Sequence, residues 1–182
     1  LLFSYAILLV PESLMDYVTG LPQITYLEKP KPLFFADAFM RSISCITPVQ
    51  EGVMGLSGNG VLLACIDSGV DYAHPDFCAP DGTSRIAILW DQTIPGNPPM
   101  GYALGSVYTR QQINEALASS TPEERFALVP SRDVTGHGTA VLGIAAGNGR
   151  SSADAAMRGV APEATLVVVK LGNPDPADLP RT

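Results

Sequence analysis

The chain has 182 residues, 46% of them hydrophobic, and a formal net charge of −7 at pH 7. This length and composition allow a single domain with a sizeable core. The acidic balance, without a basic patch, argues against a nucleic-acid partner. The three cysteines form no paired framework, and the composition fits a reducing compartment.

The first thirty residues predict a small strand–helix–strand unit. Residues 3–10 are mainly apolar and predict a strand. This opening is too short to span a bilayer and lacks the basic start and cleavage site of a signal peptide, so we expect no membrane partner. Pro11 suits the first turn of a helix that Gly20 ends. Residues 24–28 predict a second strand, and Pro30 prevents further ladder pairing.

The central feature of the sequence is a strand that ends on a carboxylate. Residues 60–66 form an apolar run that is typical of a strand buried on both faces. The run ends at Asp67, after which Ser68 and Gly69 turn the backbone. The carboxyl ends of strands in an open α/β sheet border its ligand crevice. An ionised acid is costly there unless a donor hydrogen-bonds it.

A histidine further along the chain is the expected partner of Asp67. His137 stands between two glycines in the sequence Thr-Gly-His-Gly-Thr. Histidine is the side chain that a buried carboxylate orients for proton transfer. Residues 137–147 predict a helix, and its positive end favours a neutral imidazole. The apolar face of this helix is expected to hold Ala140, Val141, Ile144 and Ala145.

Between these two residues the sequence predicts one strand and two helices. Residues 85–90 predict a strand, which a segment rich in proline and glycine ends. Two capping boxes, at residues 109–112 and 121–124, each predict the start of a helix. After the histidine helix, residues 166–171 predict a further buried parallel strand.

Three segments closely resemble the signatures of the subtilisin-like serine peptidases. The first is Ile-Asp-Ser-Gly-Val-Asp at residues 66–71, continued by His-Pro-Asp-Phe at 74–77. The second covers residues 136–147, and the third is Gly-Val-Ala-Pro-Glu-Ala at 159–164. The order Asp, His, then Ser is the subtilisin order. Three motifs in this order are a specific signal, and the resemblance covers residues 5–182.

The resemblance implies a subtilisin-like three-layer α/β fold with a mostly parallel sheet, incomplete here, after a partial α+β propeptide. It implies a serine endopeptidase that acts on a protein or peptide substrate. Asp67 would orient His137, and His137 would take the proton of a serine. Ser68 is expected to be a turn residue. The nucleophilic serine and the oxyanion asparagine are expected beyond Thr182, so this chain alone is expected to be inactive.

The resemblance also divides the chain. Residues 1–35 would be the C-terminal half of a propeptide that acts as a chaperone and stays bound in cis or after cleavage. Cleavage is expected near Phe34, Phe35 or Ala36. Residues 36–182 would be the N-terminal part of the catalytic domain, beginning with an irregular arm.

An insertion in the catalytic domain is expected at about residues 84–129, because Asp67 and His137 are further apart than in compact subtilisins. The insertion is similar to that of the clostridial germination (Csp-type) subtilases. This resemblance suggests the spore or the cytoplasm, and the residues themselves leave the localisation unknown.

Metal binding is left open by the sequence. In some family members the acid that matches Asp76 helps to hold a structural calcium ion. The loop that would supply the other ligands, residues 148–154, departs from the calcium pattern and carries Arg150. We therefore expect no required cofactor. For His74 we expect local hydrogen bonds in its loop and no catalytic role.

Two other functions compete with the peptidase. A pseudoprotease on the same fold would act as a regulatory binding module in spore germination, and it would need neither the acid nor the histidine. The serine region would decide between it and the peptidase. A metal hydrolase has suitable ligand types but no recognised spacing. Its cluster would consist of Asp67, Asp71, His74, Asp76 and His137.

Overall fold

The structure of the chain, a computed structural model, describes residues 10–27 and 38–173. The predicted strand at residues 3–10, except Val10, lies outside the described residues. The predicted processing position near Phe34 lies outside them as well.

The chain divides into two compact units, and the described part of the first, Leu1–Phe35, contains one 3-10 turn and one short helix. A 3-10 turn at Glu12–Leu14 leads into α1, Met15–Thr19, which ends at Gly20 as predicted. The strand predicted at residues 24–28 is wrong for residues 24–27, which form a bend and irregular backbone. An extended segment becomes a strand only when a neighbour takes up its backbone hydrogen bonds. No described residue of this unit does so.

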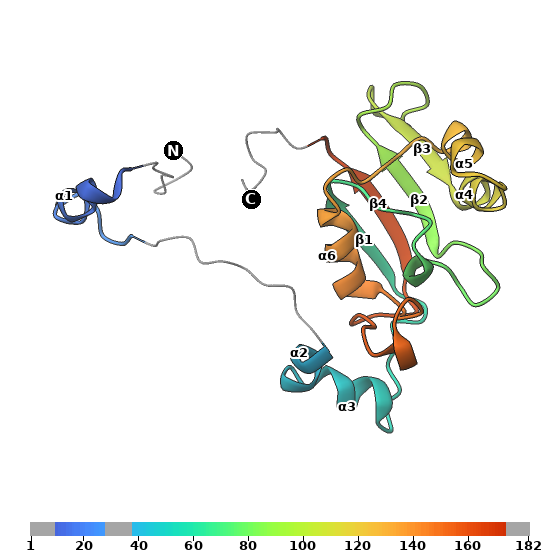
Figure 1. Cartoon of the computed structure of the whole chain (residues 1–182), viewed down its shortest axis with the longest axis horizontal. Helices are drawn as coiled ribbons and strands as arrows, with labels where there is room; N and C mark the ends of the chain where they lie inside the picture. Colours follow the sequence, from blue (N-terminus) through green and yellow to red (C-terminus); the bar gives the residue numbers. More distant parts are fainter. Residues whose placement is uncertain (1–9, 28–37, 174–182) are drawn as a thin grey trace. The chain divides into compact units, whose positions relative to one another are not determined.

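The second unit, Ala36–Thr182, is built around a four-stranded sheet of order β1-β4-β2-β3 (Figure 1). The strands are β1 Leu62–Asp67, β2 Ile86–Asp91, β3 Ser106–Thr109 and β4 Thr165–Lys170. β1, β4 and β2 are parallel, and β3 pairs antiparallel with β2. The mostly parallel sheet confirms the predicted fold class. β3 was missed because four residues are too few to show a period.

Three charged residues end the parallel strands side by side. Asp67 of β1 is in register with Lys170 of β4, and Lys170 is in register with Asp91 of β2. These residues lie at the carboxyl edge of the sheet. This edge is where parallel α/β sheets place their ligands.

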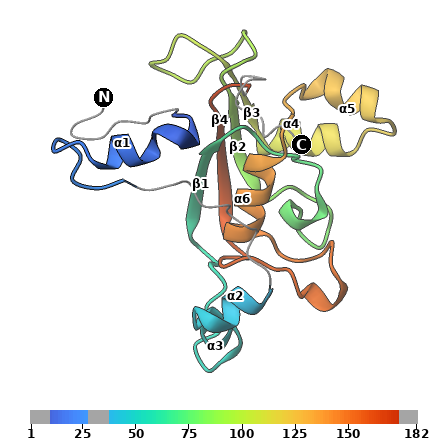
Figure 2. The same ribbon diagram turned by 60° about the vertical axis from the view of Figure 1, so that its left-hand side comes forward.

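Helices pack against the sheet (Figure 2). α6, His137–Ala146, packs on β1, and α4, Arg110–Leu117, packs on β2 and β3. α5, Pro122–Leu128, packs beside α4, and both helices begin with the predicted capping boxes. No helix in the described part of the chain has both the length and the apolar character that a membrane crossing requires. The core cluster includes the fully buried side chains of Tyr72, Phe77, Ile86, Leu89, Ile113, Leu142 and Leu166.

The prediction that β1 is buried on both faces is wrong. The side chains of Leu62 and Ile66 are 66% and 61% exposed, while Cys65 between them is buried. β1 is an outer strand of the sheet, and α6 packs on it. Successive strand residues point to opposite faces, so the face with Leu62 and Ile66 is left open by the described residues.

The predicted buried face of α6 is also wrong in part. Leu142 and Ala146 are fully buried, whereas Val141 and Ile144 are exposed. Apolar residues occur on every side of this helix, so the sequence pattern does not show which side is covered. The position of the sheet decides it.

Two short helices replace the irregular arm that was predicted before β1. α2 is Ala38–Ile43 and α3 is Ile46–Glu51. The Gln50 side-chain amide donates to the carbonyl oxygens of Gly159 and Val160, both at 2.8 Å. Hydrogen bonds to a segment more than a hundred residues away therefore help to hold the arm in place.

Candidate active site

The carboxyl end of β1 and the start of α6 bring together the two residues of the predicted dyad. Asp67 is the last residue of β1, and His137 is the first residue of α6. His137 Nδ1 lies 2.7 Å from Asp67 Oδ1, which is a hydrogen-bond distance. The contact expected from the sequence is present.

The dyad is open to solvent on the side of the imidazole. The His137 side chain is 65% exposed, and that of Asp67 is 19% exposed. Asp67 Oδ1 also accepts a hydrogen bond from the Ser68 N–H at 2.7 Å. Partial burial raises the pKa of Asp67, but the hydrogen bonds from His137 and Ser68 outweigh it and hold the pKa below the ordinary value. An ionised Asp67 can hold the Nδ1–H and leave Nε2 free to exchange a proton.

The glycines beside His137 are required for two different reasons. A Cβ on Gly138 would lie 2.2 Å from the Gly69 carbonyl oxygen, so no side chain fits where α6 approaches the turn after β1. Gly136 has φ of 75°, in the left-handed region, directly before the helix. The close approach therefore occurs at Gly138, whereas Gly136 provides the backbone conformation.

Ser68 lies in a supporting position. Its Oγ donates to Asp133 Oδ1 at 2.8 Å and accepts from the Gly138 N–H at 3.0 Å. Its hydroxyl is thus bonded to a carboxylate, which supports the turn role predicted for it. Asp133, which stands four residues before His137, was not predicted from the sequence. An acid just before the start of a helix was the signal that could have found it.

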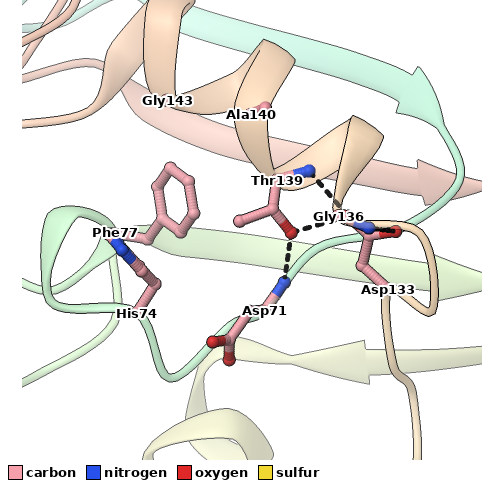
Figure 3. A pocket seen from close by; sticks show the side chains of 8 residues that line it. All are labelled: Asp71, His74, Phe77, Asp133, Gly136, Thr139, Ala140 and Gly143. Carbon is pink, nitrogen blue, oxygen red and sulfur yellow. Dashed lines mark hydrogen bonds between the residues drawn. The ribbon is translucent and has the colours of Figure 1, made fainter. Parts of the chain in front are cut away.

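A pocket of about 440 Å³ lies beside the first turns of α6 (Figure 3). Neither Asp67 nor His137 lines it, but Gly136, which directly precedes His137, does. His74 Nδ1 accepts from the Asp76 N–H at 3.3 Å, the kind of local hydrogen bond that was expected. The lining residues are Asp71, His74, Phe77, Asp133, Gly136, Thr139, Ala140 and Gly143.

The alternative metal cluster is not assembled. Among the described residues, no three His, Cys, Asp or Glu side chains lie where they could hold a metal ion together. This finding covers all five residues of the cluster, because each lies within residues 38–173. This arrangement therefore gives no support to the metal-hydrolase interpretation.

The surroundings of Asp76 do not fit the calcium ion that the sequence left open. Asp76 is 6% exposed, and its Oδ1 accepts from the Ser151 N–H at 2.8 Å. Arg85 donates to the Asp76 carbonyl oxygen, and Arg150 donates to the carbonyl oxygens of residues 78–79. Calcium takes about six to eight oxygen ligands. Two guanidinium groups already bind the carbonyl oxygens of residues 76, 78 and 79 in this loop.

Comparison with known proteins gives a consistent result. Residues 58–179 match the family described as "Subtilase family", and residues 1–31 match the "Csp protease B prodomain". A comparison with curated proteins finds no match.

Among solved structures, the chain is similar to the CspB protease of Clostridium perfringens, with 33% sequence identity and a TM-score of 0.61. The similarity covers 74% of this chain and 25% of the protease chain, so this chain spans about a quarter of that protein. The subtilase match alone covers more than half of this chain. The chain therefore belongs to the subtilase family, and it is similar to a Csp protease within that family.

Proposed function

We propose that this chain supplies the acid and the base of a serine endopeptidase that hydrolyses peptide bonds with an Asp–His–Ser triad. The observation that carries the proposal is the 2.7 Å contact between Asp67 and His137 at the carboxyl edge of a subtilase sheet. The nucleophilic serine is proposed to come from sequence beyond Thr182. The similarity to a Csp protease favours a role of the peptidase in spore germination.

Each residue of the dyad has one task in this mechanism. As the serine oxygen attacks the carbonyl carbon, His137 Nε2 takes the serine proton. When the carbon–nitrogen bond breaks, the same nitrogen gives the proton to the leaving amine. Asp67 holds the Nδ1–H throughout, which keeps the tautomer correct and stabilises the imidazolium.

We further propose that residues 1–35 are the C-terminal half of a propeptide that binds the catalytic part in cis or after cleavage. The match of residues 1–31 to the CspB prodomain supports this division. Residues 36–182 would then begin the catalytic domain, and the partners of the whole protein would be its own propeptide and a protein or peptide substrate.

A fluorophosphonate probe, which labels activated serines, tests the proposal. The complete protein should be labelled, whereas the 182-residue chain alone and a complete His137→Ala variant should not. His74→Ala is the matched control, because His74 lies outside the dyad, and it should keep the labelling. Equal labelling of His137→Ala would overturn the assignment of the base. An unlabelled complete protein would instead favour the pseudoprotease.

A further inference from the structure

Asp133 lies close to the dyad, and both of its carboxylate oxygens accept several hydrogen bonds. Oδ1 accepts from Ser68 Oγ at 2.8 Å, from the Gly136 N–H at 3.0 Å and from Thr135 Oγ1 at 3.2 Å. Oδ2 accepts from the N–H and the Oγ1 of Thr139, at 2.8 and 2.7 Å. One side chain therefore receives five hydrogen bonds, some of which are visible in Figure 3.

The donors to Asp133 are neighbours of both members of the dyad. Ser68 directly follows Asp67, while Gly136 and Thr139 stand on either side of His137 in the sequence. A second pair of hydrogen bonds closes the same junction. The Gly138 N–H donates to Ser68 Oγ at 3.0 Å, and the Asp71 N–H donates to Thr139 Oγ1 at 2.9 Å.

An ionised carboxylate suits this position better than any neutral side chain. Gly136, the residue before α6, offers no side-chain cap, so the free N–H groups of the first turn need another acceptor. A negative charge near this end also interacts favourably with the helix dipole. Burial raises the pKa of Asp133, but the hydrogen bonds from Thr139, Ser68 and Gly136 outweigh it and hold the pKa below the ordinary value.

We propose that Asp133 is the positioning residue of the dyad, because its carboxylate joins the turn after Asp67 to the turn that begins with His137. Without it, the links left between these turns would be the Asp67–His137 contact and the hydrogen bonds from Gly138 to Ser68 and from Asp71 to Thr139. This inference rests on the proposed function for its catalytic meaning. Its structural part, the control of the Asp67–His137 hydrogen bond, is testable without any hydrolysis.

The first experiment follows the Nδ1 proton of His137 by NMR in the 182-residue chain labelled with ¹⁵N-histidine. A proton held between an imidazole nitrogen and a carboxylate resonates far downfield, and the chain has only two histidines, so His74→Ala assigns the signal. In Asp133→Asn, one acceptor oxygen becomes a donor that faces other donors. The proton should then exchange with solvent at least about tenfold faster, the factor expected for a lost hydrogen bond to a charged group.

Two further variants separate positioning from general stability. Asp81→Asn is the matched control, since the Asp81 carboxylate accepts only from Thr83 among the hydrogen bonds of the described residues, and it should leave the signal unchanged. Ser68→Ala keeps the Asp133 charge and removes one donor, so it should speed exchange by a smaller factor. If Asp133→Asn does not fold, Ser68→Ala decides. An unchanged signal in the folded variants overturns the proposal.

The second experiment measures the complete enzyme. Asp133→Asn should lower kcat about tenfold with little change in KM, because a mispositioned base weakens the chemical step and leaves substrate binding intact. If kcat were unchanged while the NMR signal changed, Asp133 would control the geometry of the dyad without affecting catalysis. That result would overturn the catalytic part of the proposal. Absence of hydrolysis in the parent enzyme would count against the proposed function only, since the NMR experiment stands without it.

Discussion

Asp67 and Asp91 end parallel strands on either side of Lys170, yet their surroundings differ completely. Asp91 is fully buried. Its Oδ2 accepts from Ser131 Oγ at 2.6 Å and lies 3.9 Å from Lys170 Nζ, while its Oδ1 accepts from the N–H and hydroxyl of Thr93. Its partners Ser131 and Lys170 are buried as well, whereas Thr93 is exposed.

Asp67 accepts fewer hydrogen bonds than Asp91 and is more exposed to solvent. Its Oδ1 binds Ser68 and His137, and the His137 ring is mostly exposed. A fully enclosed carboxylate with a cation stabilises one conformation, because any change leaves a charge buried without a partner. A half-buried carboxylate that holds an exposed imidazole is an arrangement that can transfer a proton. One edge of the sheet thus provides structure at β2 and the candidate active site at β1.

If variants of the dyad kept full hydrolysis, the β1 end of this edge would not be an active site. His137→Ala in the complete enzyme should lower kcat by a factor on the order of 10⁶, the loss measured when the histidine of a subtilase triad is removed. Asp67→Asn should lower kcat by about 10⁴, because the tautomer is no longer held. Rates of peptide hydrolysis check both values. His137→Ala should hardly change the free energy of unfolding, since its side chain is mostly exposed.

Variants of the Lys170–Asp91 pair should change the stability of the fold, in contrast to His137→Ala. Lys170→Met removes the cation and leaves Asp91 buried and charged, so the free energy of unfolding should fall by about 3–5 kcal/mol. Denaturant unfolding followed by circular dichroism measures this loss. The double variant Lys170→Met/Asp91→Asn should recover part of it, because no unpaired charge remains. A loss below about 1 kcal/mol in the single variant would show that the pair does not hold the edge.

The loss of stability at acidic pH should depend on the carboxylates at the β1 end of the sheet edge. Asp67 and Asp133 have pKa values below the ordinary value in the folded state. Such a group contributes stability at every pH above its unfolded-state pKa of about 3.9, and the contribution is lost as the pH falls through the folded-state pKa. Denaturant unfolding at a series of acidic pH values should show this decline, and Asp67→Asn and Asp133→Asn should each flatten it. Parallel curves for parent and variants would contradict the assignment.

The smallest effect is expected from removal of metal ions. EDTA or added calcium should leave Tm unchanged, because Arg85 and Arg150 bind the carbonyl oxygens around Asp76. Arg150→Ala should lower the free energy of unfolding by about 1 kcal/mol through the loss of these hydrogen bonds. Differential scanning calorimetry measures both changes. A rise of Tm with calcium would show that the loop rearranges to bind the ion.

The parts of the structure that were predictable depend on residues close together in the sequence. The capping boxes at Thr109 and Thr121 are formed within four residues, and both are present. Asp67 was identifiable because an apolar run ends on it, and His137 because glycines flank it at the start of a helix. Asp133 was missed because one of its main partners, Ser68, is 65 residues away.

The sequence by itself determined the family, the strands β1, β2 and β4, the helices around them, and the acid and imidazole at their ends. These follow from local patterns of hydrophobicity, capping and turn residues, and from motifs read along the chain. Only the tertiary structure decided which faces of β1 and α6 are covered, that Lys170 pairs with Asp91, and that Asp133 joins the two halves of the dyad. The reason is physical. Burial and buried hydrogen bonds depend on residues that are distant in the sequence and are brought into contact only by the fold.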